Sequence, residues 1–210
     1  MMRFIQKWSY SCANYLMNQM GENHQKRSVY YYGFQIIIGA VVKGVLLVSI
    51  ALLFRSLIPT LIAVLTFSSL RVIAGGYHMD TYGKCISLSL AMFIVAGIVV
   101  QYTHLHWNIY YTITLVVLSF ITALFVLIKW APADTPNKPI TDPKEIKKFK
   151  SLSIIYALVW LVLQSVFIYK GLKMFAIASC FGLLLELYTV TPNGHNFFDR
   201  ISGQVDTIKG

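Results

Sequence analysis

The chain has 210 residues, of which 57% are hydrophobic and only 12% are charged. Soluble domains carry about 25% charged residues, so this composition excludes an ordinary soluble protein and leaves an apolar excess that must face lipid. The formal net charge of +10 is high enough to suggest a nucleic-acid-binding protein. No basic helix or pattern of stacking aromatic residues supports that class of protein. We therefore expect an integral membrane protein whose partner is the lipid bilayer and not nucleic acid.

Residues 1–28 predict an amphipathic helix that lies on the inner membrane surface or on the helical bundle. Apolar residues recur there every three or four positions: Phe4, Ile5, Trp8, Cys12, Tyr15, Leu16 and Met20. This spacing places them on one face of a helix. Residues 21–28 are expected to lead out of it. The stretch has no unbroken apolar core and no small-residue cleavage site, so we expect no signal peptide.

Six hydrophobic segments follow, each close to the length that a bilayer requires. They cover residues 30–54, 57–73, 86–103, 107–129, 151–169 and 172–190. Helices are expected, because every backbone polar group in lipid must be satisfied within its own span. The predicted fold is an all-α, polytopic bundle of six transmembrane helices over residues 29–190, within a single membrane domain that covers residues 1–210.

The distribution of basic residues predicts the orientation of this bundle. Arg71 and Lys84 flank the connection between the second and third segments, and further lysines gather around the connection between the fourth and fifth: Lys129, Lys138, Lys144, Lys147, Lys148 and Lys150. The alternate connections carry few basic residues. Because lysine and arginine collect on the cytoplasmic side, both termini, residues 71–85 and the loop at 130–150 are expected in the cytoplasm.

The loop at 130–150 begins with a proline-rich stretch, residues 131–139, which cannot form a regular helix. Residues 140–150 could begin a helix that continues into the fifth span, with Thr141 or Asp142 as its cap. The last stretch, residues 191–210, contains Pro, Asn and Gly and is expected to form a loosely ordered cytoplasmic tail.

The residues with the richest chemistry lie between Arg71 and Cys85. A cysteine becomes a nucleophile when a nearby imidazole accepts its proton, and the same imidazole can then protonate a leaving amine. His78 and Cys85 are seven residues apart. In a straight helix this is about 10.5 Å of rise, too far for a contact of about 3 Å. A catalytic pair therefore requires the chain to bend, which Gly75-Gly76 and Gly83 would permit.

The same residues also have a plainer interpretation, in which His78 is an ordinary loop histidine and Cys85 a cysteine at the lipid edge. Asp80 would orient His78 only if its side chain points that way, and two residues along the chain it could point elsewhere. Arg71 would either bind an acidic part of a substrate or anchor the chain at the lipid headgroups.

One charge falls within a predicted span and needs a separate explanation. Lys43 lies in the first segment, where a charge is costly. It could pair with Glu186 in the sixth segment and so close the bundle, or its long side chain could reach back to the interface.

The cysteine spacing and the motif content argue against a metal site. The three cysteines are an odd number without CxxC spacing, which suggests neither a disulfide framework nor a zinc site. Cys12 and Cys180 are expected to be small packing residues. No HExxH motif or carboxylate cluster lies on a span, which argues against a metalloprotease. We therefore expect no metal and no cofactor.

The block from Arg71 to Cys85 resembles the accessory gene regulator B (AgrB) family of Gram-positive bacteria. The family pattern has an arginine, then a glycine followed closely by a histidine, then a cysteine seven residues later; it is matched here by Arg71, Gly75, Gly76, His78 and Cys85. Residues 131–139 and the lysine-rich stretch after them look like the family's central cytoplasmic loop. The length, the number of spans and the N-terminal amphipathic segment also fit.

The resemblance implies a membrane cysteine endopeptidase that cuts a propeptide near its C-terminal end and keeps the acyl part as a thioester on Cys85. An internal cysteine or serine of the peptide would then close a thiolactone or lactone ring, giving the precursor of a quorum-sensing peptide. His78 would be the general base and acid. The resemblance allows for a homodimer, and the supporting or substrate-binding candidates are Arg71, Gly75, Gly76, Asp80 and Lys138.

A transporter or exporter of a small peptide is the alternative from another class. Such a protein should show polar sites near the middle of the bilayer and two related halves. Only Lys43 and Glu186 suggest the first feature, and no related halves are visible. A structural membrane scaffold is a weaker option, because it does not explain the residues between Arg71 and Cys85.

Overall fold

A computed structural model describes residues 2–22, 24–77, 82–133 and 142–202, and these contain helices but no β-strand. In chain order the helices are α1 (Met2–Met20), α2 (His24–Leu53), α3 (Leu57–Ala74), α4 (Tyr82–Thr103), the short 3-10 helix η1 (His104–His106), α5 (Ile109–Trp130), α6 (Pro143–Tyr169), α7 (Lys173–Val190) and α8 (Pro192–Ser202). Six of them, α2 to α7, are long and apolar enough to cross a bilayer. The predicted all-α, polytopic membrane fold is confirmed.

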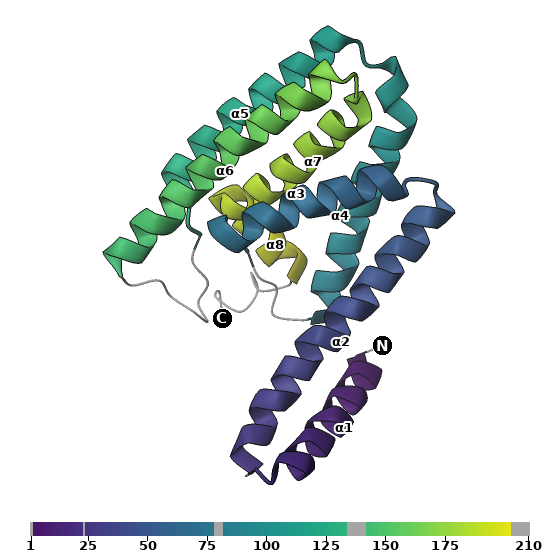
Figure 1. Ribbon diagram of the computed structural model, residues 1–210, viewed down its shortest axis with the longest axis vertical. Coiled ribbons are helices and arrows are strands. Elements are labelled where there is room, and N and C mark those ends of the chain that lie inside the picture. The colour runs from purple at the N-terminus through teal and green to yellow at the C-terminus, as the bar shows by residue number, and fades with distance from the viewer. Residues whose placement is uncertain (1, 23, 78–81, 134–141, 203–210) are drawn as a thin grey trace.

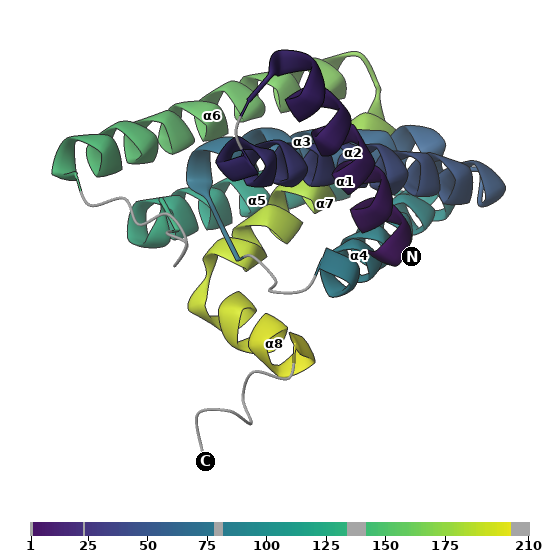
Figure 2. The same cartoon turned by 90° about the horizontal axis from the view of Figure 1, so that it is seen from below.

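Helix α7 lies at the centre of the bundle and is the most buried of the six spans. It packs against α3, α4, α5 and α6, and α3 in turn contacts α4 (Figure 1). Helix α1 lies along α2, to one side of the other helices. Figure 2 shows α8 leaving the bundle beyond the end of α7. This arrangement brings the last turn of α3, the start of α4, the end of α7 and α8 to one end of the molecule.

Small side chains allow α7 to approach α3 closely. A Cβ atom on Gly182 would lie 2.9 Å from the Cα atom and 3.0 Å from the carbonyl carbon of Ala63 in α3. Cys180 is fully buried in the same helix, as expected of a small packing residue. Membrane helices associate through such small residues, because lipid supplies no hydrophobic force between them.

We expect Gly182→Ala to destabilise the protein by about 1–3 kcal/mol, because the added methyl group would meet the backbone of α3 and not a flexible side chain. Thermal unfolding in detergent measures this. Gly44→Ala in α2 is the matched control, since a Cβ there would have no atom within 4 Å. Equal unfolding temperatures for the two variants would contradict the close contact between α3 and α7.

The boundary predicted between the N-terminal segment and the first span is wrong by several residues. Helix α2 begins at His24, within the stretch expected to lead out of the first helix. Lys26 Nζ and Tyr30 OH each donate a hydrogen bond of 2.6 Å to the carboxylate of Glu22 at this turn, and they hold the pKa of Glu22 below its usual value. A 30-residue helix is about 45 Å long, more than a bilayer core of about 30 Å. The hydrophobic segment predicted at residues 30–54 therefore corresponds only to the apolar part of α2.

The start of α6 agrees with one of the predicted caps. Asp142 precedes the helix, and its carboxylate accepts a hydrogen bond of 2.9 Å from the backbone N–H of Lys144. Pro143 occupies the first helical position, where its missing N–H costs nothing. The helix continues from there into the fifth span, so the loop predicted at 130–150 ends near Asp142. Thr141 lies outside the described residues.

The prediction of a loosely ordered tail is wrong for residues 192–202, which form α8. Thr191 Oγ1 accepts a hydrogen bond of 3.2 Å from the backbone N–H of Gly194, and Pro192 occupies the first position of the helix. A capping threonine followed by proline is a signal for a helix start that was present in the sequence. Phe198 is buried, and so fastens α8 to the rest of the protein.

Candidate functional site

The chain leaves α3 through a turn that only glycines adopt easily. Gly75 has φ of +75° and Gly76 has φ of +133°, both in the region that disfavours other residues. Gly75 and Gly76 therefore form a turn, as their sequence permits, and the approach of His78 to Cys85 stays a prediction. Gly83 does not contribute to this turn, because α4 begins at Tyr82 and Gly83 lies within its first turn.

Arg71 fixes this turn from the last turn of α3. Its guanidinium donates hydrogen bonds to Thr189 Oγ1 at 2.8 Å and to the backbone carbonyl of Tyr77. It also forms an ion pair at 3.4 Å with the carboxylate of Glu186, a residue of α7 that is fully buried. These contacts join α3, α7 and the chain that follows Gly76.

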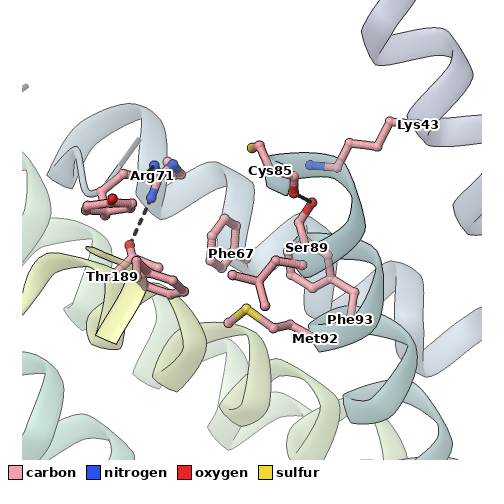
Figure 3. Close-up of a pocket in the computed structure, with 11 residues that line it drawn as sticks. Lys43, Phe67, Arg71, Cys85, Ser89, Met92, Phe93 and Thr189 are labelled. Carbon is pink, nitrogen blue, oxygen red and sulfur yellow. Dashed lines mark hydrogen bonds between the residues drawn. The ribbon is translucent and has the colours of Figure 1, made fainter. Parts of the chain in front are cut away.

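The predicted pairing of Lys43 with Glu186 is wrong, because Glu186 pairs with Arg71. Lys43 projects from α2 toward the start of α4 instead (Figure 3). The sequence has two basic residues, Lys43 and Arg71, that could reach one buried acid. Only the packing of α3 directly against α7 decides between them.

Tyr77 connects the turn to the C-terminal helix. Its backbone N–H donates to the carbonyl of Thr189 at 3.0 Å, and its hydroxyl donates to Asp199 Oδ1 at 2.8 Å. Its ring stacks on Phe198 with centroids 5.2 Å apart and meets the ring of His195 edge-on at 5.4 Å. Sequence reasoning missed all three α8 residues, because it treated that stretch as a loose tail.

The two motifs singled out in the sequence meet in space. The backbone N–H of Ala133 donates to the carbonyl of Ala74 at 2.8 Å, and Gly75 forms an isolated bridge with Ala133. A Cβ on Gly75 would collide with the Ala133 carbonyl oxygen, so this contact requires glycine. The start of the proline-rich loop therefore rests against the turn that leads toward His78. Lys138 lies outside the described residues.

Cys85 is half-buried in the first turn of α4. The partial positive charge at a helix N-terminus favours a negative charge on a side chain placed there. Ser89 Oγ, one turn later, donates to the Cys85 carbonyl at 2.6 Å. Cys85 therefore lies at a helix N-terminus, one of the positions at which nucleophilic cysteines are found in proteins.

The thiol of Cys85 lines a cavity of about 110 Å³. Five helices and the turn contribute to its wall: Lys43 (α2), Phe67 and Arg71 (α3), Tyr77, Cys85, Leu88, Ser89, Met92 and Phe93 (α4), Thr189 (α7) and Phe198 (α8). Most of this lining is apolar or aromatic, and two cations lie within it (Figure 3). A cavity of this size and lining suits a single apolar side chain of a ligand placed beside Cys85.

The structure thus brings together four of the predicted site residues: Arg71, Gly75, Gly76 and Cys85. The predicted base His78 and its candidate partner Asp80 lie outside the described residues, directly after Tyr77. Nowhere in the described ranges do three His, Cys, Asp or Glu side chains lie close enough together to hold a metal ion.

Comparison with known proteins gives consistent relatives. The family model named accessory gene regulator B matches residues 9–190. An AgrB-like protein of Clostridium perfringens (strain SM101 / Type A) is 26% identical over 91% of this chain and 93% of its own length. The accessory gene regulator protein B of Staphylococcus intermedius is 32% identical over 76% of this chain and 79% of its own. The accessory gene regulator protein B of Staphylococcus lugdunensis is 28% identical over 91% of this chain and 96% of its own length.

No solved structure matches the chain. The family model nevertheless covers the spans, the glycine turn, Cys85 and the central loop, and every residue of the cavity wall except Phe198. The chain therefore belongs to the accessory gene regulator B family, and so has a role in the quorum-sensing system of that name.

Proposed function

We propose that the protein is a membrane cysteine endopeptidase that cuts a quorum-sensing propeptide near its C-terminal end and promotes its cyclisation. The observation that carries this proposal is the position of Cys85. Its thiol lines a cavity, at the N-terminus of α4, whose wall also contains Arg71 and Tyr77. His78, the residue expected to act as base, is the next residue in the sequence after Tyr77.

The reaction begins with transfer of the Cys85 thiol proton to the imidazole of His78. The thiolate attacks the carbonyl carbon of the scissile peptide bond; a C–S bond forms, and the carbonyl electron pair moves onto oxygen. Collapse of this intermediate reforms the carbonyl and breaks the C–N bond, and the imidazolium gives its proton to the leaving amine. The products of this step are the released C-terminal fragment and an acyl thioester on Cys85.

The second step transfers the acyl group to the peptide itself. An internal cysteine or serine gives its proton to His78 and attacks the thioester carbonyl, which closes a thiolactone or lactone ring and returns the electron pair to Cys85. A tethered nucleophile has a high effective concentration. The apolar side chains Phe67, Met92 and Phe93 beside Cys85 limit access of water, the nucleophile that would compete.

We place this site, both termini and the loop after α5 on the cytoplasmic side. The support is the charge pattern: the lysines of residues 142–150 form the exposed start of α6, and Lys129 ends α5. Arg71 and Lys84 flank the connection that carries the site. A propeptide made in the cytoplasm would then reach Cys85 without crossing the membrane.

The test is cleavage of the cognate propeptide by the purified protein in lipid vesicles. We expect Cys85→Ala and His78→Ala each to lower the cleavage rate by at least roughly 10³-fold, because each removes a member of one catalytic unit. Cys12→Ala is the matched control, since Cys12 lies on α1, away from the cavity wall. Cleavage at an unchanged rate by Cys85→Ala would overturn the assignment of the nucleophile and point to a different protease site, whereas no cleavage by the wild-type protein would favour a peptide exporter.

A further inference from the structure

We infer that Lys43 is a further residue of the reaction, whose ammonium group stabilises the thiolate of Cys85. This inference rests on the proposed function, because it assigns a role within the same cavity. The residue comes from α2, far from the motif between Arg71 and Cys85, and only the fold brings the two together. Three observations carry it: the position of Lys43, the charge balance of the cavity and the cost of a cation in a span.

The side chain of Lys43 points from α2 toward the first turns of α4, where Cys85 and Ser89 lie (Figure 3). Both Lys43 and Cys85 line the cavity. The Lys43 side chain therefore belongs to the wall of the cavity that holds Cys85.

Among the described residues, no acidic group compensates the charge of Lys43. Arg71, the other cation of the cavity, is paired with Glu186. Lys43 has no carboxylate within 4.0 Å among the residues that the structure describes. Of the groups that face Cys85 from packed elements, Lys43 (α2) and Arg71 (α3) are cations and Tyr77 is a phenol. The formal sum, with Glu186 counted, is one positive charge.

An uncompensated cation in a span is expensive and usually marks a functional site. The sequence around Lys43 is otherwise apolar from Ile36 to Leu53, apart from glycines and a single serine. Within a cavity that holds one thiol, the anion that this cation can meet is the thiolate, which forms when His78 takes the proton. Positive groups close to a cysteine raise its thiolate fraction. The role assigned to Lys43 is electrostatic, and no proton transfer is assigned to it.

The experiment measures the reactivity of Cys85 and not cleavage. The full-length protein in lipid vesicles is treated with iodoacetamide, a neutral reagent, and mass spectrometry follows modification of Cys85 between pH 5 and pH 10. We expect Lys43→Met to slow alkylation at pH 7 about tenfold and to raise the midpoint of the pH profile by about one unit, since one unit lowers the thiolate fraction about tenfold near neutral pH.

Two further variants separate charge from structure. Lys43→Arg keeps the charge and should react within about threefold of the wild type. Lys173→Met removes a lysine at the opposite end of α7 from Thr189, roughly 24 Å along the helix, and should leave the profile unchanged. If Lys43→Met does not fold, as judged by thermal unfolding, Lys43→Gln gives the same comparison with a neutral, polar side chain.

The outcomes distinguish this inference from the proposed function. An unchanged alkylation profile in a folded Lys43→Met or Lys43→Gln variant overturns the role of Lys43, even if Cys85→Ala abolishes cleavage. Loss of reactivity in Lys43→Arg as large as in Lys43→Met also overturns it, because shape and not charge would then matter. If Cys85→Ala still cleaves but the profile depends on Lys43, the assignment of Cys85 as the nucleophile fails and the electrostatic assignment stands.

Discussion

Replacement of Arg71 with methionine is expected to destabilise the protein by roughly 3–5 kcal/mol, because it leaves a buried carboxylate without its charge partner. Glu186 is fully buried, and its second oxygen, Oε1, has no hydrogen-bond partner in the described part of the protein. Arg71 also donates to Thr189 and to the carbonyl of Tyr77, so its loss frees the turn that leads to His78. Unfolding in detergent measures the loss of stability.

The double variant Arg71→Met/Glu186→Gln is the control for this prediction. It removes both charges, so we expect it to recover most of the stability lost in Arg71→Met. It should not recover cleavage, because the bonds to Thr189 and Tyr77 are still missing. Simple additivity of the two single changes would contradict the pairing, since residues that interact directly show a coupling energy.

Gly76→Ala is expected to lower the cleavage rate by about 10²-fold, the cost of a misplacement near 1 Å at a catalytic group. A Cβ at this position would lie 2.5 Å from both Arg71 Nη1 and Thr189 Oγ1, and φ of +133° adds backbone strain. The change must therefore move either the anchor of the turn or the chain that continues to His78. The rate of propeptide cleavage measures it.

Gly171→Ala is the control that introduces backbone strain without a steric collision. Gly171 also has a positive φ, +70°, but a Cβ there would have no atom within 4 Å. This variant should lose some stability through strain, about 1–3 kcal/mol, and should keep its cleavage rate. If Gly76→Ala cleaves as fast as Gly171→Ala, the contact between Gly76 and the Arg71–Thr189 pair does not position the catalytic residues.

The six spans could be predicted from the sequence. A bilayer requires a certain length and an apolar composition, and both are visible in a short stretch of residues. The turn at Gly75-Gly76 and the cap at Asp142 could also be predicted from the sequence. Helix ends outside the apolar core were harder to place. The start of α2 at His24 is polar, and α8 is amphipathic, so hydropathy marks neither of them.

The composition of the cavity could not be predicted, because its wall comes from elements that are far apart in the chain. Nothing in the local sequence indicates that Lys43 faces Cys85, or that Tyr77 docks on Phe198 and Asp199. The partner of Glu186 depends on the packing of α3 against α7, so the sequence left Lys43 as one possible partner, and that possibility is wrong.

The most direct measurement of the central claim is the mass of Cys85 during turnover. The protein in vesicles is mixed with a propeptide whose internal cysteine or serine is replaced by alanine, so that the acyl group cannot leave by cyclisation. We predict an adduct on Cys85 with the mass of the N-terminal fragment, which hydroxylamine removes and which Cys85→Ala lacks. Cleavage of this peptide without an adduct on Cys85, or with an adduct on another residue, would contradict the assignment.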